Sequence, residues 1–324
     1  MFSSARPMLT ARSDFRAFWR DTLGELDETP INLDSQRLGR APYAGLSASR
    51  LAFTSLGNVR LQGYSIRWSD DRPRPVVVHA HGYGGRAAMQ WLWARSGLNV
   101  VGFDVRGHGE SFRAVPDQSP WGYMLTGIED PDGHVLQGAV SDYARASQVA
   151  AVLFEGRVRR TVFHGYSFSA ALALMTEAAR PAADLLVLGV PTFGWHEGRH
   201  RLVRSGSAVE TRAYINARPD RTEAVMRTLS YFDSMNFAPL IRCPVIAGFG
   251  RRDEVVPPET VLAVLGHLRC PSETMSFPVS HTDEPEEAAW EHFDAIWIDA
   301  ALYGLPPDFG DAAEIQRIEF DRHR

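Results

Sequence analysis

Short apolar runs alternate with segments of helical character along most of this chain. Continuous apolar stretches of strand length occur at residues 75–80, 98–103, 161–163, 184–190 and 244–250, and a last short strand is expected at 273–277. Such runs are typical of strands that are buried on both faces of a sheet. Helices are expected between and after them, at 86–96, 139–154, 170–179, 258–268 and 284–302. This alternation predicts an α/β protein with a mostly parallel, doubly wound sheet.

Before these runs, apolar and polar residues alternate with a period of two. Residues 51–54 and 61–68 flank the turn Gly57-Asn58, which predicts an antiparallel hairpin at the edge of the sheet. No internal repeat or low-complexity linker interrupts the sequence, so we expect a single domain over residues 1–324. Its additional parts would be an N-terminal extension at 1–45 with an amphipathic helix near 13–20, a helical insertion at 192–238 and a C-terminal tail at 305–324.

One predicted strand runs into Gly165-Tyr166-Ser167-Phe168-Ser169, and an Ala- and Leu-rich helical segment follows. A strand, a sharp turn with a serine and a helix are typical of the nucleophile elbow of the α/β-hydrolase fold, G-x-S-x-G. The last glycine is here Ser169, which is small enough for a helix that passes close to the strand. A serine in an ordinary strand–helix loop is the alternative, so the prediction depends on the rest of the chain.

A serine hydroxyl becomes an effective nucleophile only when a base removes its proton and a carboxylate orients that base. In α/β-hydrolases these groups follow in the order Ser, Asp, His, each after a strand. Asp253 and His281 follow the last two predicted strands in this order. Alone, Asp253 also fits a turn or helix cap, Glu254 competes with it, and His281 fits a surface loop. Their joint order favours Ser167, Asp253 and His281 as a catalytic triad.

Ester chemistry at Ser167 also requires two backbone N–H donors for the developing oxyanion. One would be the amide of Phe168, directly after the nucleophile. The other should come from the loop after strand 75–80, His81-Gly82-Tyr83-Gly84-Gly85, whose glycines allow an amide to turn inward. We therefore predict Tyr83 as the second donor.

Composition excludes several other classes of protein. All 34 basic residues are arginine, which excludes lysine Schiff-base chemistry and P-loops. The net charge of −5 gives no electrostatic reason to expect a nucleic acid or an anionic membrane as a partner. Two cysteines, Cys243 and Cys270, are too few for a disulfide framework and are expected to be inert thiols. No signal peptide or membrane span is evident, so we expect a cytoplasmic protein that needs no cofactor.

A competing motif is His196-Glu197-Gly198-Arg199-His200, which matches the zinc-protease pattern H-E-x-x-H. Two histidines one helical turn apart would bind zinc, and the glutamate would act as the base. Gly198 weakens a helix interior by about 1 kcal/mol, and no third ligand is evident. We therefore expect no metal and interpret the segment as part of the acyl pocket, with Tyr83, Pro191, Phe193 and Trp195 as substrate contacts.

Several longer stretches together resemble one enzyme family. They are His81-Gly82-Tyr83-Gly84, Asp104-Val105-Arg106-Gly107-His108-Gly109, Trp121-Gly122-Tyr123 with Gly127-Ile128-Glu129-Asp130-Pro131, the elbow, Leu229-Ser230-Tyr231-Phe232-Asp233, residues 238–245 and Asp253-Glu254-Val255-Val256-Pro257-Pro258. Over about residues 10–305 the chain is similar to the acetylxylan esterase / cephalosporin-C deacetylase family, carbohydrate esterase family seven.

The resemblance implies the same triad, with Tyr83 and Phe168 as oxyanion donors. It implies small acetyl esters as substrates, of xylo-oligosaccharides or of the acetoxy group of a cephalosporin. It also implies assembly into a homo-oligomer, a hexamer in the family. A longer-chain or more apolar esterase, a thioesterase or a peptidase on the same fold, and a silent binding protein remain alternatives.

Two stretches depart from the family pattern. The family's Arg-Gly-Gln is here Arg106-Gly107-His108, and its Gly-Gly-Ser-Gln-Gly-Gly elbow is here Gly165-Tyr166-Ser167-Phe168-Ser169-Ala170. Catalysis requires only a backbone amide from residue 168. We therefore expect the departures, including an aromatic ring beside the nucleophile, to change substrate preference toward a more apolar ester.

Overall fold

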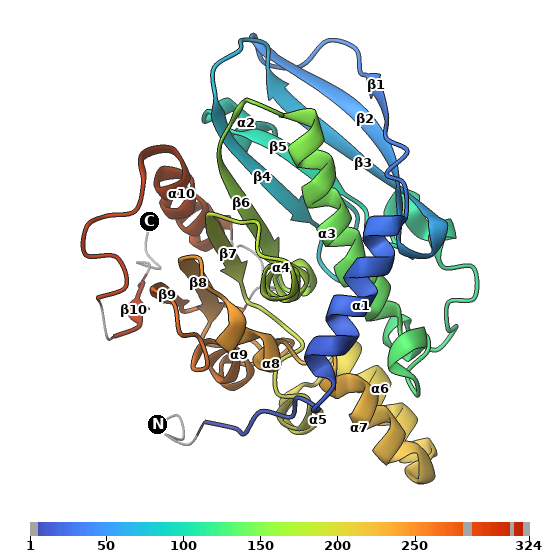
Figure 1. Cartoon of the computed structure of the whole chain (residues 1–324). Coiled ribbons are helices and arrows are strands. Elements are labelled where there is room, and N and C mark those ends of the chain that lie inside the picture. Colours follow the sequence, from blue (N-terminus) through green and yellow to red (C-terminus); the bar gives the residue numbers. More distant parts are fainter. Residues whose placement is uncertain (1–5, 281–286, 312–313, 320–324) are drawn as a thin grey trace.

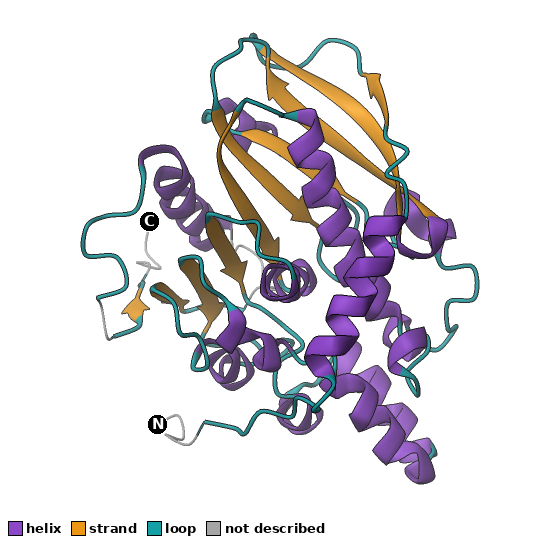
Figure 2. Ribbon diagram, viewed as in Figure 1, coloured by secondary structure: helices purple, strands orange, loops and turns teal. Residues whose placement is uncertain are grey.

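A single twisted sheet runs through the molecule (Figures 1 and 2). The computed structural model describes residues 6–280, 287–311 and 314–319. In these ranges the strand order is β1-β2-β3-β5-β4-β6-β7-β8-β9-β10. The strands are β1 (Asp34–Arg37), β2 (Leu46–Ser55), β3 (Val59–Trp68), β4 (Arg74–Ala80), β5 (Asn99–Phe103), β6 (Val158–Tyr166), β7 (Leu185–Gly189), β8 (Val245–Gly250), β9 (Ser272–Phe277) and β10 (Gln316–Arg317). Pairing from β5 to β10 is parallel, which confirms the predicted doubly wound sheet.

The predicted hairpin is confirmed at the edge of the sheet. Strands β2 and β3 pair antiparallel from Leu46↔Trp68 to Ser55↔Val59, and β3 pairs antiparallel with β5. The N-terminal extension adds a strand to this edge and a helix to one face of the sheet. Strand β1 pairs with β2 on its outer side, and helix α1 (Phe15–Glu28) is longer than the helix expected near residues 13–20.

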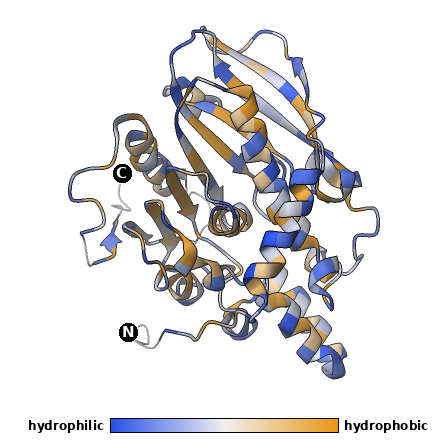
Figure 3. Cartoon of the chain, in the orientation of Figure 1, coloured by the Kyte–Doolittle hydropathy of each residue, from blue (hydrophilic) through white to orange (hydrophobic). Residues whose placement is uncertain are grey.

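Helices cover both faces of the sheet, and the apolar core divides between the two sides. Helices α1, α3 (Val135–Leu153) and α4 (Phe168–Ala179) lie on one face, and α2 (Trp91–Arg95) and α10 (Glu287–Tyr303) lie on the other (Figure 1). Along β4, Val76 and Val78 join the first core and Val77 joins the second. This alternation explains why β4 has three valines in succession, and the orange central strands in Figure 3 illustrate the same apolar character.

One predicted helix is much shorter than expected. Residues 86–96 contain only α2, and the chain before Trp91 is irregular. Side chains of the sheet bind the backbone there: the Asp104 carboxylate accepts from the amide of Ala87, and the Tyr64 hydroxyl accepts from the amide of Gln90. These bonds compete with helical hydrogen bonds, which the apolar pattern alone did not reveal.

The helical insertion follows β7 and is built from short helices. They are α5 (His196–Leu202), α6 (Ser207–Ala217), α7 (Thr222–Ser230) and α8 (Ser234–Phe237), and α9 (Pro258–Leu265) lies between β8 and β9. In the tail, β10 pairs parallel with β9. Among the described helices, none has the length and apolar character to cross a bilayer.

Candidate active site

Ser167 stands at the sharp turn between β6 and α4, as predicted. Its backbone has φ 53° and ψ −110°, a conformation that residues other than glycine rarely adopt. Two contacts hold it there: the Ser167 amide donates to the carbonyl of Gly189 (2.8 Å), and the Ser167 carbonyl accepts from Ala171 in the first turn of α4 (3.2 Å). The side chain is partly exposed, so the strained turn presents its hydroxyl at the carboxyl ends of the parallel strands.

Ser169, in the place of the last glycine of the elbow motif, reinforces this turn. Its fully buried hydroxyl donates to the carbonyl of Tyr166 and accepts from the amide of Tyr166, both at 3.0 Å. Helix and strand also approach so closely that a Cβ on Gly165 would overlap the backbone of Ser169 and Ala170. The sequence indicated only that a small residue fits at 169; the structure adds that the hydroxyl ties the helix to the strand.

Phe168 is buried, and its ring belongs to the core. The ring is 0% exposed and packs with its centroid 5.6–6.3 Å from those of five other rings, His81, Tyr83, His108, Tyr123 and Phe193. The prediction that Phe168 places an aromatic ring beside the nucleophile is therefore wrong, because the ring is buried inside the protein. His108, the other departure from the family pattern, belongs to the same cluster, where burial lowers its pKa to about 4.

The loop with Tyr83 is held in place by two buried polar residues. His81 accepts a hydrogen bond from the amide of Val105 at Nε2 (3.1 Å), so its Nδ1–H donates to the carbonyl of Gly82 (2.7 Å). Asp104 accepts from the amides of Ala87 (2.5 Å) and Glu110 (2.7 Å). These bonds join the loops after β4 and β5.

Both predicted oxyanion donors keep their hydrogen-bonding capacity. In the described part of the chain, no acceptor is found for the amide of Tyr83 or for that of Phe168. The side chains of the two residues are in contact, with ring centroids 5.7 Å apart. A developing oxyanion requires two such N–H donors, and the proposed role of these amides rests on this capacity.

The two other predicted triad residues are described to different extents. Asp253 lies in the loop after β8, is 3% exposed, and its Oδ1 accepts from the amides of Val255 (2.9 Å) and Val256 (2.8 Å). His281 lies outside the described residues. The chain that leads to it runs beside the Asp253 loop, since the amide of Arg252 donates to the carbonyl of Val279 (3.4 Å). The role of His281 therefore stays a prediction.

Two of the four predicted substrate contacts need correction. Pro191 and Phe193 are buried, and the Phe193 ring packs between Phe168 and the Arg199 guanidinium, 4.8 Å from its centroid. They support the elbow from inside and offer no surface to an acyl group. Tyr83 and Trp195 are partly exposed and remain candidates.

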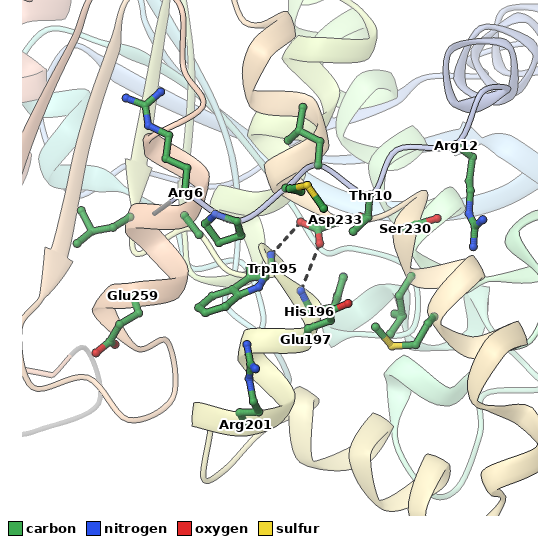
Figure 4. A pocket seen from close by; sticks show the side chains of 17 residues that line it. Arg6, Thr10, Arg12, Trp195, His196, Glu197, Arg201, Ser230, Asp233 and Glu259 are labelled. Carbon is green, nitrogen blue, oxygen red and sulfur yellow. Dashed lines mark hydrogen bonds between the residues drawn. The ribbon is translucent and has the colours of Figure 1, made fainter. Parts of the chain in front are cut away.

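Trp195 borders a cavity of about 750 Å³ between the N-terminal segment and helices α5, α7 and α9 (Figure 4). The described lining of this cavity includes neither Ser167 nor Tyr83. Asp233, which also lines the cavity, accepts hydrogen bonds from the amides of Trp195 (2.9 Å) and His196 (3.2 Å). Burial raises the pKa of Asp233 to about 6. The sequence reasoning did not identify this cavity.

The H-E-x-x-H segment forms α5, but its side chains have other partners. His196 Nε2 faces the carbonyl of Phe232 (3.4 Å), and His200 Nε2 faces the hydroxyl of Thr211 (2.8 Å). The Arg199 guanidinium lies 3.5 Å from the other ring nitrogen of His196, which opposes a cation there. Among the described residues, no three His, Cys, Asp or Glu side chains form a group suited to a metal.

A strained serine elbow between a strand and a helix, at the carboxyl edge of a parallel sheet, defines the chain as an α/β-hydrolase. Comparison with known proteins is consistent with this class and identifies one family within it. The profile of the acetyl xylan esterase (AXE1) family matches residues 2–293, so the chain belongs to this family.

Similar proteins have the same fold over nearly the whole chain. An acetyl xylan esterase from Paenibacillus sp. R4 superposes with a TM-score of 0.80 at 26% identity, covering 90% of this chain and 96% of the other. Acetyl xylan esterase 1 from Thermoanaerobacterium sp. JW/SL YS485 gives 0.80 at 20% identity, covering 92% and 96%. The acetyl esterase Axe7A of Xylanibacter ruminicola is 22% identical over 286 residues, 85% of this chain. The match spans only 64% of that longer relative.

Proposed function

We propose that this protein is a serine carboxylesterase that removes acetyl groups from small esters, such as acetylated xylo-oligosaccharides and cephalosporin-type acetoxy groups. The observation that carries the proposal is the backbone of Ser167, held at φ 53° directly before the Phe168 amide. A serine is placed in so unfavourable a conformation only where the surrounding structure requires it. Membership in the acetyl xylan esterase family supports the acetyl group as the acyl part.

The proposed reaction uses an acyl-enzyme intermediate. His281, oriented by Asp253, takes the proton of Ser167 as the Ser167 oxygen attacks the ester carbonyl. The amides of Tyr83 and Phe168 donate to the oxyanion of the tetrahedral intermediate. The intermediate collapses, and the alcohol leaves with the proton from His281. Water activated by His281 then attacks the acyl-serine and releases acetate.

The test is hydrolysis of a p-nitrophenyl ester series, from acetate to octanoate, by the wild-type protein and by Ser167→Ala. We expect activity to be highest with acetate and to fall by a factor of at least about 10⁴ in the variant. Ser141→Ala, a buried serine in α3, is the matched control and should retain activity. Wild-type activity in Ser167→Ala would refute the mechanism. Highest activity with a longer acyl chain would refute the assignment of acetyl esters as substrates.

EDTA separates the serine mechanism from zinc chemistry at α5. Activity should be indifferent to EDTA, because the imidazoles of His196 and His200 are engaged by protein groups. Inactivation by EDTA, together with full activity of Ser167→Ala, would mean that the H-E-x-x-H segment is the reactive site.

A further inference from the structure

We propose that Glu210, on helix α6 of the insertion, is a positioning residue that holds the oxyanion loop through the hydroxyl of Tyr83. The inference rests on the proposed function, because it assigns a role to the Tyr83 amide in ester hydrolysis. It adds a residue that neither the sequence motifs nor the triad includes. It also gives the insertion a part in the reaction.

The contacts of Glu210 form a compact clamp. The Tyr83 hydroxyl donates to the Glu210 carboxylate, 2.8 Å from Oε2 and 3.0 Å from Oε1. The amide of Met124 donates to Oε2 and to the Tyr83 hydroxyl oxygen, both at 3.2 Å. A Cβ on Gly122 would overlap the carboxylate, so Gly122 leaves the space that Glu210 occupies. Three segments distant in the sequence thus meet at one carboxylate.

Tyr83 transmits this clamp to the oxyanion site. Its amide is one proposed donor, and its ring packs edge to face against Phe168, whose amide is the other. The Tyr83 ring also contacts Tyr123 and His108, with centroids 5.8 and 5.9 Å away. Fixing the hydroxyl therefore fixes the ring, and the ring defines where the loop places its amide relative to Phe168.

The hydrogen bonds, more than the negative charge, would carry this role. A carboxylate close to a developing oxyanion opposes the reaction, and burial already raises the pKa of Glu210. The nearby Arg199 is 3% exposed and offsets that charge at longer range, while its own hydrogen bond goes to Ser207 (2.9 Å). A glutamine at 210 can accept from Tyr83 and Met124 with its one oxygen. Glu210→Gln should therefore preserve the clamp, whereas Glu210→Ala removes it.

The size of the effect follows from the demands of the oxyanion hole. Complete loss of one donor lowers kcat by about 10²–10³-fold. Loosening the loop leaves the amide in place but less well aligned, so we expect a decrease of about tenfold in kcat with KM changed by less than about threefold. Tyr83→Phe removes the hydroxyl from the other side of the same contact and should give a similar loss.

The chain supplies a matched control on the same helix. Tyr214, one turn further along α6, donates its hydroxyl to Glu129. This bond also joins the insertion to the loop before α3, but it does not touch Tyr83. Tyr214→Phe therefore removes an equivalent tyrosine–glutamate bond, and kcat should stay within about twofold of wild type.

The experiment measures kcat and KM for p-nitrophenyl acetate with wild type, Glu210→Ala, Glu210→Gln, Tyr83→Phe, Tyr214→Phe and the double variant Tyr83→Phe/Glu210→Ala. We expect losses in kcat for Glu210→Ala and Tyr83→Phe, rescue by Glu210→Gln, and no further loss in the double variant. Thermal unfolding of each variant identifies any that fail to fold.

Two results would overturn the inference. One is a folded Glu210→Ala protein whose kcat matches that of Tyr214→Phe, and the other is a Glu210→Gln protein as slow as Glu210→Ala. Ser167→Ala, run in parallel, separates this failure from that of the proposed function. If Ser167→Ala is inactive while Glu210→Ala is fully active, only the clamp is refuted.

Discussion

Replacing Ser169 by alanine removes the hydroxyl that ties α4 to β6 without changing the size of the side chain much. In the wild type this hydroxyl bonds both the amide and the carbonyl of Tyr166 at 3.0 Å, and it is fully buried. Its loss leaves two backbone groups without that partner next to the strained Ser167. A buried polar group without a partner costs about 1–3 kcal/mol, so for the two groups we expect a destabilisation of about 2–6 kcal/mol.

Thermal unfolding can resolve a change of this size. At about 2.1 cal/mol/K per residue, the unfolding entropy of a chain of this length is about 0.7 kcal/mol/K, so Tm should fall by about 3–9 °C. Ser141→Ala is the control, because the Ser141 hydroxyl donates one bond to the carbonyl of Gln137 within α3 (2.9 Å). That carbonyl lies inside a helix, so Tm should fall by only about 1 °C.

The same variant should also slow the reaction. Ser167 keeps its conformation through the ends of β6 and α4, and Ser169 joins those ends. We expect kcat for p-nitrophenyl acetate to fall several-fold while KM changes little. A Tm of Ser169→Ala equal to that of Ser141→Ala would refute the reasoning, because the hydroxyl would then contribute no more than an ordinary helix bond.

Two further predictions concern buried groups near the elbow. Phe168→Gln, which restores the family residue, should cost about 3–5 kcal/mol in urea unfolding, because its amide would lie among rings. Adding His108→Gln should recover part of this lost stability, since the rings of His108 and Phe168 have centroids 5.6 Å apart and the two sites are therefore coupled. Strictly additive changes in unfolding free energy in the double variant would contradict this prediction. Asp233 has its pKa raised from 3.8 to about 6 by burial, so it stays protonated in the folded protein while the unfolded chain ionises. Its contribution to stability should fall by about 3 kcal/mol as pH rises from about 3 to about 7, with about 2 kcal/mol of that fall between pH 4 and 6. The unfolding free energy of Asp233→Asn should lack this decrease, and equal pH slopes for both proteins would disprove it.

Local sequence was sufficient for the order of elements and for the sharp turn at Ser167. Strands β4 and β7 contain runs of consecutive apolar residues because helices cover both faces of the sheet, and this pattern is visible along the chain. The elbow at Ser167 was predictable for a similar reason, since its steric demands fall on residues adjacent in sequence. The position of Asp253 shortly after strand β8 can likewise be read from the sequence.

Contacts between distant segments were decided only by the tertiary structure. Phe168 could not be placed from the sequence, because whether its ring faces the substrate or the core depends on rings such as Tyr83 and Tyr123 from other loops. Glu210 carries no motif, and its meeting with Tyr83 requires the insertion to fold back over the oxyanion loop. Periodicity reports which side of a helix or strand is apolar. It does not report which partner that side meets, because packing depends on shape and contact across the whole chain.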